Sequence, residues 1–171
     1  VGMACIDVAW AQDALLAMLE QTTPDGMLPH MVCADGSHSD ITQPPILAWA
    51  ALNVLRHGGS ETWARECLPR LHAYLEWIRT HRDRNDNGIP EWFIEGNPLC
   101  RCGESGADNS SVYDRAVLLD APDFASFLCN DWQCLAEINA RLGHTEAAGA
   151  CRDRAAAVAE AVRRLLWSPE D

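Results

Sequence analysis

The sequence predicts an all-α fold of antiparallel helix hairpins. Along most of the chain, apolar residues recur at spacings of three and four, the periodicity of one helix face. Glycine or proline stands at the ends of these periodic segments, as expected where a helix stops. No segment has the sustained polar and apolar alternation of a half-buried strand. Helices joined by alternating short and long connections pack as hairpins, so we expect about five helices in such an array.

The first helix is expected over residues 4–20, and it ends before the turn at residues 22–26. Its apolar stripe consists of Ile6, Trp10, Ala14 and Met18. The second helix is expected over residues 44–57, because prolines are tolerated at a helix start and Gly58 follows the end. Thr42 is the expected N-cap of this helix.

The third helix shows helical periodicity over residues 61–82, but Pro69 lies inside this stretch. Proline removes a helical hydrogen bond and clashes with the preceding turn, so we expect the helix to begin near Pro69. Residues 122–141 and 145–167 are the last two expected helices, and Gly143 marks the stop between them. An odd number of helices leaves one hairpin incomplete, which indicates a fragment of a larger domain.

Composition narrows the class of protein. The 171 residues are 48% apolar and 22% charged, which is typical of one soluble globular domain. A formal net charge of −12 disfavours binding to nucleic acid or to an anionic membrane, because no basic surface meets the phosphates. No apolar run approaches the ~20 residues that cross a bilayer, and the N-terminus lacks the features of a signal peptide.

Eight cysteines are present, and most of them stand singly within helical patterns. A thiol in such a position is commonly a small buried apolar group, so we interpret them as reduced and the protein as cytoplasmic. Cys100 and Cys102 differ, because a Cys-x-Cys pair in a loop can bind metal or oxidise. No second pair accompanies them, which favours structural thiols over a metal site.

Residues 83–113 form a connection far longer than the usual ~4–6 residues. Loops of this length are commonly functional. Carboxylates, amides and an indole gather in and beside it: Glu91, Trp92, Glu95, Glu104, Asp108, Asn109 and Asp114. Carbohydrate sites use this set, since carboxyl groups transfer protons, amides bind hydroxyls and flat rings lie against sugars. The same polar residue types also fill ordinary turns.

The order of residues in this loop is more specific than its composition. Residues 103–114, GESGADNSSVYD, resemble the Glu-Ser-Gly-x-Asp-Asn-Ser-Pro-x-x-Asp motif of glycoside hydrolase family 63 and the related mannosylglycerate hydrolases. They resemble more distantly the Glu-Ser-Gly-Trp-Asp motif of trehalases. Three further segments match the first family in the same order: PDGMLPH at 24–30, TQPPILAWA at 42–50 and NGIPEW at 87–92.

The resemblance implies an (α/α)6 toroid, of which residues 1–171 would form a part, and an inverting hydrolysis without a required cofactor. The implied substrate is a small glycoside or oligosaccharide with an α-linked glucosyl or mannosyl residue. Asp108 has the position of the general acid, a role that needs a carboxyl kept protonated in a partly desolvated cleft. The implied substrate contacts are Gln43, Trp92, Glu104, Asn109 and His30. As a lone loop histidine, His30 also fits a structural role.

Two departures from the family pattern bear on this expectation. Ser111 and Val112 replace a proline and an arginine that the family commonly has, which removes a charge suited to an acidic substrate. The family's catalytic base is a glutamate in a later hairpin, and no residue of this chain matches it. Inversion needs that second carboxylate about 6.5–9.5 Å across the bond. We therefore expect the base, and the remaining helix hairpins of the domain, outside these residues.

Residues 83–88, DRNDNG, resemble the start of an EF-hand loop, in which alternating oxygen-bearing side chains and a glycine wrap calcium. The ligands expected for such a calcium site are Asp83, Asn85, Asn87 and Glu91. Position twelve of the loop is Ile94, so the usual bidentate glutamate is absent, and Glu91 or Glu95 would replace it. A plain turn rich in Asp and Asn is the alternative.

Two other classes of protein remain as alternatives. A non-catalytic helical-repeat module would bind a protein through its stacked hairpins, but the sequence has no period near ~34 or ~40–47 residues. A lyase or isomerase on a similar toroid commonly uses a His or Tyr base, and neither type clusters in the long loop. The glycosidase is therefore the leading hypothesis.

Overall fold

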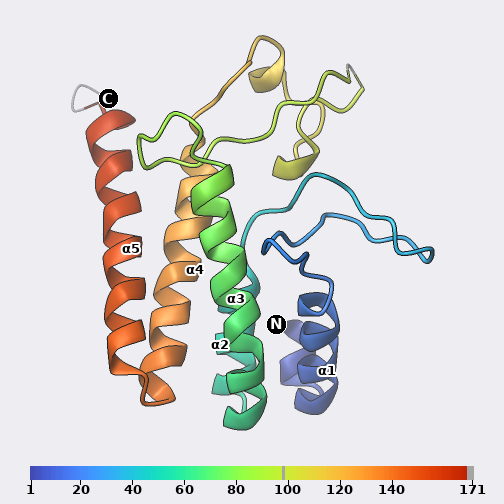
Figure 1. The fold of residues 1–171 in the computed structure, drawn as a ribbon, viewed down its shortest axis with the longest axis vertical. Coiled ribbons are helices and arrows are strands. Elements are labelled where there is room, and N and C mark those ends of the chain that lie inside the picture. The colour runs from blue at the N-terminus through green and yellow to red at the C-terminus, as the bar shows by residue number, and fades with distance from the viewer. Residues whose placement is uncertain (98, 169–171) are drawn as a thin grey trace.

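The computed structural model describes residues 1–97 and 99–168, and within them the chain is all-helical (Figure 1). Its α-helices are α1 (Val8–Leu19), α2 (Leu47–Arg56), α3 (Glu61–His81), α4 (Pro122–Arg141) and α5 (Thr145–Leu165). The described residues contain isolated β-bridges but no strand. The all-α prediction is therefore confirmed.

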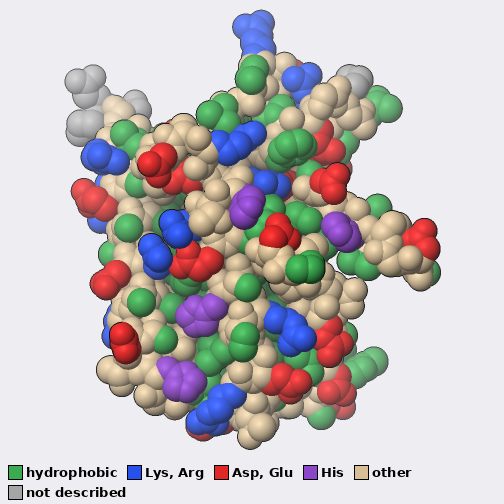
Figure 2. Space-filling model, in the orientation of Figure 1, with side chains coloured by type: hydrophobic (Ala, Val, Ile, Leu, Met, Phe, Trp, Pro, Cys, Tyr) green, Lys and Arg blue, Asp and Glu red, His purple; other side chains and the backbone are tan. Residues whose placement is uncertain are grey.

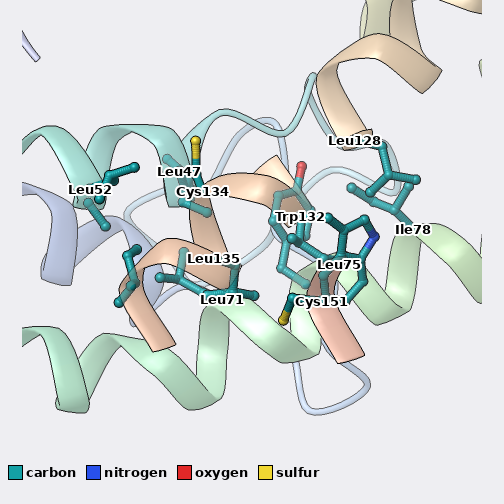
Figure 3. Packing of buried hydrophobic residues seen from close by; sticks show 14 of the residues in the cluster. Leu47, Leu52, Leu71, Leu75, Ile78, Leu128, Trp132, Cys134, Leu135 and Cys151 are labelled. Carbon is teal, nitrogen blue, oxygen red and sulfur yellow. The ribbon is translucent and has the colours of Figure 1, made fainter. Parts of the chain in front are cut away.

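The helices stand side by side, and the long connections gather at one end of the bundle (Figure 1). α4 has a central place, since it packs against α2, α3 and α5. Trp132 and Leu135 of α4 lie with Leu71 and Leu75 of α3 in an almost fully buried core (Figure 3). The bundle is thus a packed base that positions the loops at its end.

α1 buries a different face from the predicted one. The core-facing residues are Ala11, Leu15 and Leu19. The predicted stripe of Ile6, Trp10, Ala14 and Met18 is exposed instead, up to 83% at Ile6. The segment is apolar on both faces, so periodicity alone did not decide which face packs against α2 and α3. The prediction of the buried face was therefore wrong.

α2 begins at Leu47, later than predicted, and Thr42 is not its N-cap. The N-terminus is capped instead from another helix. The Asp131 carboxylate of α4 accepts hydrogen bonds from the backbone N–H groups of Ala48 and Trp49, both at 3.0 Å. A cap that lies so far away in sequence leaves no local pattern, which is why the predicted start was wrong.

α3 is one continuous helix with Pro69 inside it, so the predicted start near Pro69 was wrong. Ser60 caps the helix by accepting hydrogen bonds from the N–H groups of Thr62 and Trp63. The buried residues ahead of the proline are Trp63, Ala64, Cys67 and Leu68. Each large apolar side chain contributes ~1.5–3 kcal/mol on burial, and their sum offsets the one helical hydrogen bond that Pro69 removes.

α4 and α5 agree with the prediction. α4 has the expected bounds, and α5 ends at Leu165, close to the expected residue 167. Gly143 between them has a φ of 83°, in the left-handed region where glycine commonly ends a helix. Among the described residues, no helix combines the length and the apolar character that a membrane span requires.

The cysteines all carry free thiols, Cys100 and Cys102 included. Burial raises the pKa of the thiols of Cys134 and Cys151 to about 11, so these behave as small neutral groups of the core. Cys5 and Cys33 are exposed, contrary to the expectation that the single cysteines are buried. The expectation was wrong for these two, because Cys5 lies in a short 3-10 helix ahead of α1 and Cys33 lies in the connection between α1 and α2.

Candidate active site

The long connection between α3 and α4 lies across one end of the bundle and carries Asp108 (Figure 1). Two short 3-10 turns, Gly103–Ser105 and Ser111–Tyr113, flank this residue. The Asp108 side chain is exposed, and among the described residues its carboxylate accepts no hydrogen bond. Asn109 beside it is exposed as well. The turn therefore presents a carboxylate and an amide together on its exposed surface.

Arg101 holds the backbone around Asp108. Its N–H donates to the carbonyl oxygen of Asp108 at 2.8 Å. Its guanidinium donates to the carbonyl oxygens of Tyr113 and Asp114 at 3.0 and 2.7 Å. Glu95 adds a second anchor, since its carboxylate accepts the N–H of Gly103 at 2.8 Å. Arg101 did not emerge from the sequence, because an arginine that binds carbonyl groups in a loop has no local signature.

Glu104 lies beneath this turn and is fully buried. Its carboxylate accepts the N–H of Thr42 at 2.9 Å and the N–H of Phe93 at 3.0 Å. It also forms a buried ion pair with Arg82, whose Nε lies 3.1 and 3.0 Å from the two carboxylate oxygens. The Arg82 guanidinium is in turn enclosed by the rings of Trp77 and Phe93.

The surroundings of Glu104 differ from those of a substrate contact. Every oxygen of its carboxylate is engaged by the protein, and no part of the side chain reaches the surface. The residue instead joins three of the segments that match the hydrolase family: the one at 42–50, the one that ends beside Phe93, and its own. We therefore assign Glu104 a positioning role behind the site, which corrects the contact that the sequence implied.

Gln43 is tied to the same motif. Its side-chain amide donates to the carbonyl oxygen of Gly103 at 3.1 Å, and its own carbonyl accepts the hydroxyl of Tyr74 at 2.7 Å. Burial raises the pKa of Tyr74 far above its ordinary value, so the hydroxyl stays a donor at any physiological pH. The half-buried Gln43 is thus held at the edge of the motif, and among the described residues its amide oxygen accepts no hydrogen bond.

A cavity of about 390 Å³ opens beside Gln43. His30 and Gln43 both line it, together with Tyr74 and Phe127. Two of the predicted contacts therefore meet in one concave site. Asp108 is not among the lining residues, so the described chain does not by itself close a pocket around the predicted acid.

Trp92 is buried in the core and does not present its ring to a sugar. Its ring stacks on Phe124 with centroids 4.0 Å apart, and its indole N–H donates to Asp123 at 3.0 Å. The exposed fraction of the side chain is only 1%. Like Glu104, Trp92 packs beneath the loop and holds it against the helices. The sequence did not reveal its burial, because that depends on residues far away in the chain.

The segment at 24–30 is fixed against α3. The Asp25 carboxylate accepts the indole N–H of Trp77 at 3.0 Å. Gly26 has a φ of 104°, and a Cβ there would lie 2.8 Å from the carbonyl oxygen of Ala73, so only glycine fits. These contacts hold the segment against α3 shortly before the chain reaches His30.

The predicted calcium ligands form a loop that satisfies its own polar groups. Asp83 accepts the N–H groups of Asn87 and Gly88 at 2.9 and 3.0 Å. The side-chain amides of Asn85 and Asn87 donate to the carboxylate of Asp120, a residue that the sequence did not single out.

The fourth predicted calcium ligand, Glu91, is fully buried and accepts the N–H groups of Arg84 and Asn85. Among the described residues, no group of three or more His, Cys, Asp or Glu side chains is placed to hold a metal. The calcium site stays a prediction. It would require the amides of Asn85 and Asn87 to turn their oxygens toward the ion.

Comparisons with known proteins give the family and the fold. Residues 1–171 match the family model of the mannosylglycerate hydrolase MGH1-like glycoside hydrolase domain. A mannosylglycerate hydrolase of Thermus thermophilus is 28% identical over 141 residues, and a glucosylglycerate hydrolase of Mycolicibacterium hassiacum is 28% identical over 151 residues. Each of these matches covers 68% of this chain and 32% of the relative.

Two crystal structures of proteins from Thermus thermophilus share the fold. One is a conserved protein with a TM-score of 0.72, and the other is a family 63 mannosylglycerate hydrolase in complex with glucose, with a TM-score of 0.70. Both are 21% identical to this chain, and the match covers 96% of this chain and 54% of theirs. The helix hairpins are therefore part of an (α/α)6 toroid, and the chain spans about half the length of these structures.

Proposed function

The chain belongs to the mannosylglycerate hydrolase MGH1-like glycoside hydrolase family, and on that premise we propose that it forms part of a glycosidase with Asp108 as the general acid. The substrate is a small soluble glycoside or oligosaccharide with an α-linked glucosyl or mannosyl residue. The relatives named for mannosylglycerate and glucosylglycerate support this substrate class. The same membership counts against the alternative of a non-catalytic interaction module.

The observation that carries the proposal is the placement of Asp108. Its carboxylate lies on a turn whose backbone is fixed by Arg101, and among the described residues no cation pairs with it, so no ion pair holds it in the ionised form. The partly desolvated cleft that a general acid needs would be completed by the remaining hairpins of the domain. In an inverting reaction it protonates the glycosidic oxygen while a second carboxylate activates water on the opposite face of the sugar. That base lies outside these residues, in the remaining hairpins of the domain.

Three side chains are proposed to hold the sugar. Asn109 lies beside the acid, while Gln43 and His30 line the adjacent cavity. Amide and imidazole groups bind hydroxyls as both donors and acceptors, which suits a polyhydroxylated ligand. Glu104 and Trp92 are buried beneath the loop, and they are proposed to hold its backbone so that these side chains keep their positions.

Asp108→Asn in the intact protein tests the acid. The variant keeps the shape of the side chain but has no proton to give, so we expect kcat on α-glucosyl- and α-mannosylglycerate to fall about 10²- to 10⁴-fold. Asp86→Asn is the matched control, because Asp86 is an exposed carboxylate of the same loop. Its φ of 57° is one that asparagine adopts readily. Full activity of Asp108→Asn would reject the proposed role.

The stereochemistry is tested separately by following the anomeric proton of the released sugar by NMR during the first turnovers. Inversion predicts a β-configured sugar as the first product of an α-glycoside. An α-configured first product would contradict the inverting mechanism, even if Asp108 proves to be the acid.

The calcium site is proposed as a structural one that supports the start of the loop. Calcium, compared with an equal concentration of magnesium, should raise the midpoint of thermal unfolding, because a ligand that binds only the folded state stabilises it. Asp83→Asn should remove the effect. A midpoint that calcium leaves unchanged would eliminate the site.

The cytoplasm is the proposed location, since all the thiols are free and a cytoplasmic protein keeps its cysteines reduced. Fractionation of cells that express the intact protein tests this. Recovery of the protein outside the cytoplasm would contradict it.

A further inference from the structure

The turn that follows Asp108 borders the place of the leaving group. A general acid gives its proton to the glycosidic oxygen, so the group bonded to that oxygen must lie next to the acid. The 3-10 turn Ser111–Tyr113 comes shortly after Asp108 and belongs to the same motif. The side chains that this turn presents therefore bear on which leaving group the site accepts.

The turn presents an apolar side chain. Val112 is 65% exposed, and its backbone N–H donates to the hydroxyl of Ser110, which caps the turn. Tyr113 beside it is buried and anchors the turn in the core. The outward position of Val112 is therefore fixed, and an arginine commonly has this position in the related hydrolase motif. The chain thus carries an isopropyl group where that motif carries a cation.

The arginines around the motif do not replace this cation. The guanidinium of Arg101 donates to the carbonyl oxygens of Tyr113 and Asp114, and its Nε is buried. Arg82 is paired with the buried carboxylate of Glu104 beneath the turn. Both guanidinium groups are therefore engaged by the protein.

The exposed charges of the same segment do not favour an anion. Asp114 has an exposed carboxylate, and the exposed Arg115 follows it directly. With Asp108 included, two carboxylates stand against one guanidinium. Acidic and basic side chains lie interspersed at the loop end of the face shown in Figure 2. An anionic leaving group would lose hydration here without meeting a surplus of positive charge.

We propose that the site prefers a glycoside whose leaving group is uncharged, and that Val112 determines this preference. The inference rests on the proposed role of Asp108 and narrows the substrate class that the named relatives support. The side chain of Val112 packs against the C–H groups of a polyol or of a second sugar. An arginine in its place would instead bind the carboxylate of glycerate by a charge-assisted hydrogen bond.

α-Glucosylglycerol and α-glucosylglycerate test the preference in the intact protein, because they differ only in a hydroxymethyl group in place of the carboxylate. We expect kcat/KM to be at least about tenfold higher for the uncharged substrate, since the anion lacks a charge-assisted hydrogen bond. Val112→Arg should change the ratio of the two kcat/KM values about tenfold or more in favour of the glycerate.

Val117→Arg is the matched control. Val117 is 87% exposed on the same loop, but it lies beyond the motif, so the variant adds the same charge away from the acid. It should keep the ratio of the unmodified protein. A change of the ratio as large as that in Val112→Arg would show that added charge alone, and not its position, sets the preference.

Equal kcat/KM values for the two substrates, or a higher value for the glycerate, would overturn the proposed preference and leave the role of Asp108 untouched. An unchanged ratio in Val112→Arg would overturn the role of Val112. An intact protein that hydrolyses neither substrate would contradict the proposed function together with this inference. Should Val112→Arg not fold, Val112→Lys replaces it, and the comparison of the two substrates needs no variant.

Discussion

Glu104 connects segments of the site that are far apart in the sequence. It binds the backbone at Thr42 and Phe93 and pairs with Arg82, and both charged side chains are almost fully buried, at 0% and 9% exposure. A buried ion pair contributes little net stability when complete, but removing one partner leaves an uncompensated charge. Removing Glu104 should therefore destabilise the protein by more than the complete ion pair stabilises it.

Glu104→Gln should lower the free energy of unfolding by about 3–5 kcal/mol, because the guanidinium of Arg82 would remain buried without its counter-charge. Glu137→Gln is the control. It breaks an ion pair with Arg56 in which both side chains are 52% exposed, and it should cost at most about 1 kcal/mol. Urea unfolding of both variants measures the difference. Equal losses would show that the Glu104 pair behaves as a surface pair.

For single residues, the sequence indicated which residues lie in the candidate site better than it indicated which of them are buried. The motif order led to Asp108, Asn109 and Gln43, because a motif records residue types and spacing. It placed Glu104 and Trp92 among the sugar contacts, whereas the fold buries both, since burial is decided by helices that lie far away in the chain. The same distance explains why the clamp formed by Arg101 was not foreseen.

The start of α2 depends on a single carboxylate of another helix. Asp131 accepts the N–H groups at this helix end, and these bonds lower its pKa, but burial outweighs them and raises the pKa to about 6. The ordinary value is 3.8. Because the folded state holds the proton more tightly than the unfolded state, the stability from this proton is fully present below about pH 4 and is lost as the pH rises through about 6.

Asp131→Asn should remove this pH dependence while keeping one acceptor oxygen for α2. Between about pH 4 and pH 7, the unmodified protein should lose up to about 3 kcal/mol of stability relative to the variant, which corresponds to a shift of about two pKa units. Asp153→Asn, at an exposed carboxylate of α5, should follow the unmodified protein. Thermal unfolding across the pH range measures all three, and parallel curves for Asp131→Asn would contradict the assignment.

The helices differ in how far local sequence determines them. Both bounds of α4 and the start of α5 follow from Pro122 and Gly143, which act within one turn of the chain. The starts of α2 and α3 do not, because α2 is capped by Asp131 and α3 continues through Pro69 for the sake of core contacts. Local rules fail where a tertiary contact is worth more than the local preference.

At the scale of the whole molecule, the described chain leaves one apolar side of α1 uncovered. Ile6, Trp10 and Met18 are 83%, 63% and 50% exposed. Solved structures of the same fold extend well beyond the part that this chain matches, since the match covers 54% of their length. The exposed side chains are therefore proposed to pack against the remaining hairpins of the toroid.

This packing predicts how the 171-residue chain behaves alone. With its apolar stripe uncovered, it should self-associate, since each large apolar side chain gains ~1.5–3 kcal/mol on burial. The double variant Trp10→Gln and Met18→Gln should shift the chain toward monomer in size-exclusion chromatography with light scattering, whereas Asp13→Asn on the same helix should not. In the intact protein the same double variant should instead lower the stability, because there the stripe is covered. A monomeric parent chain, or a double variant that leaves the intact protein as stable as before, would show that the remaining hairpins pack elsewhere.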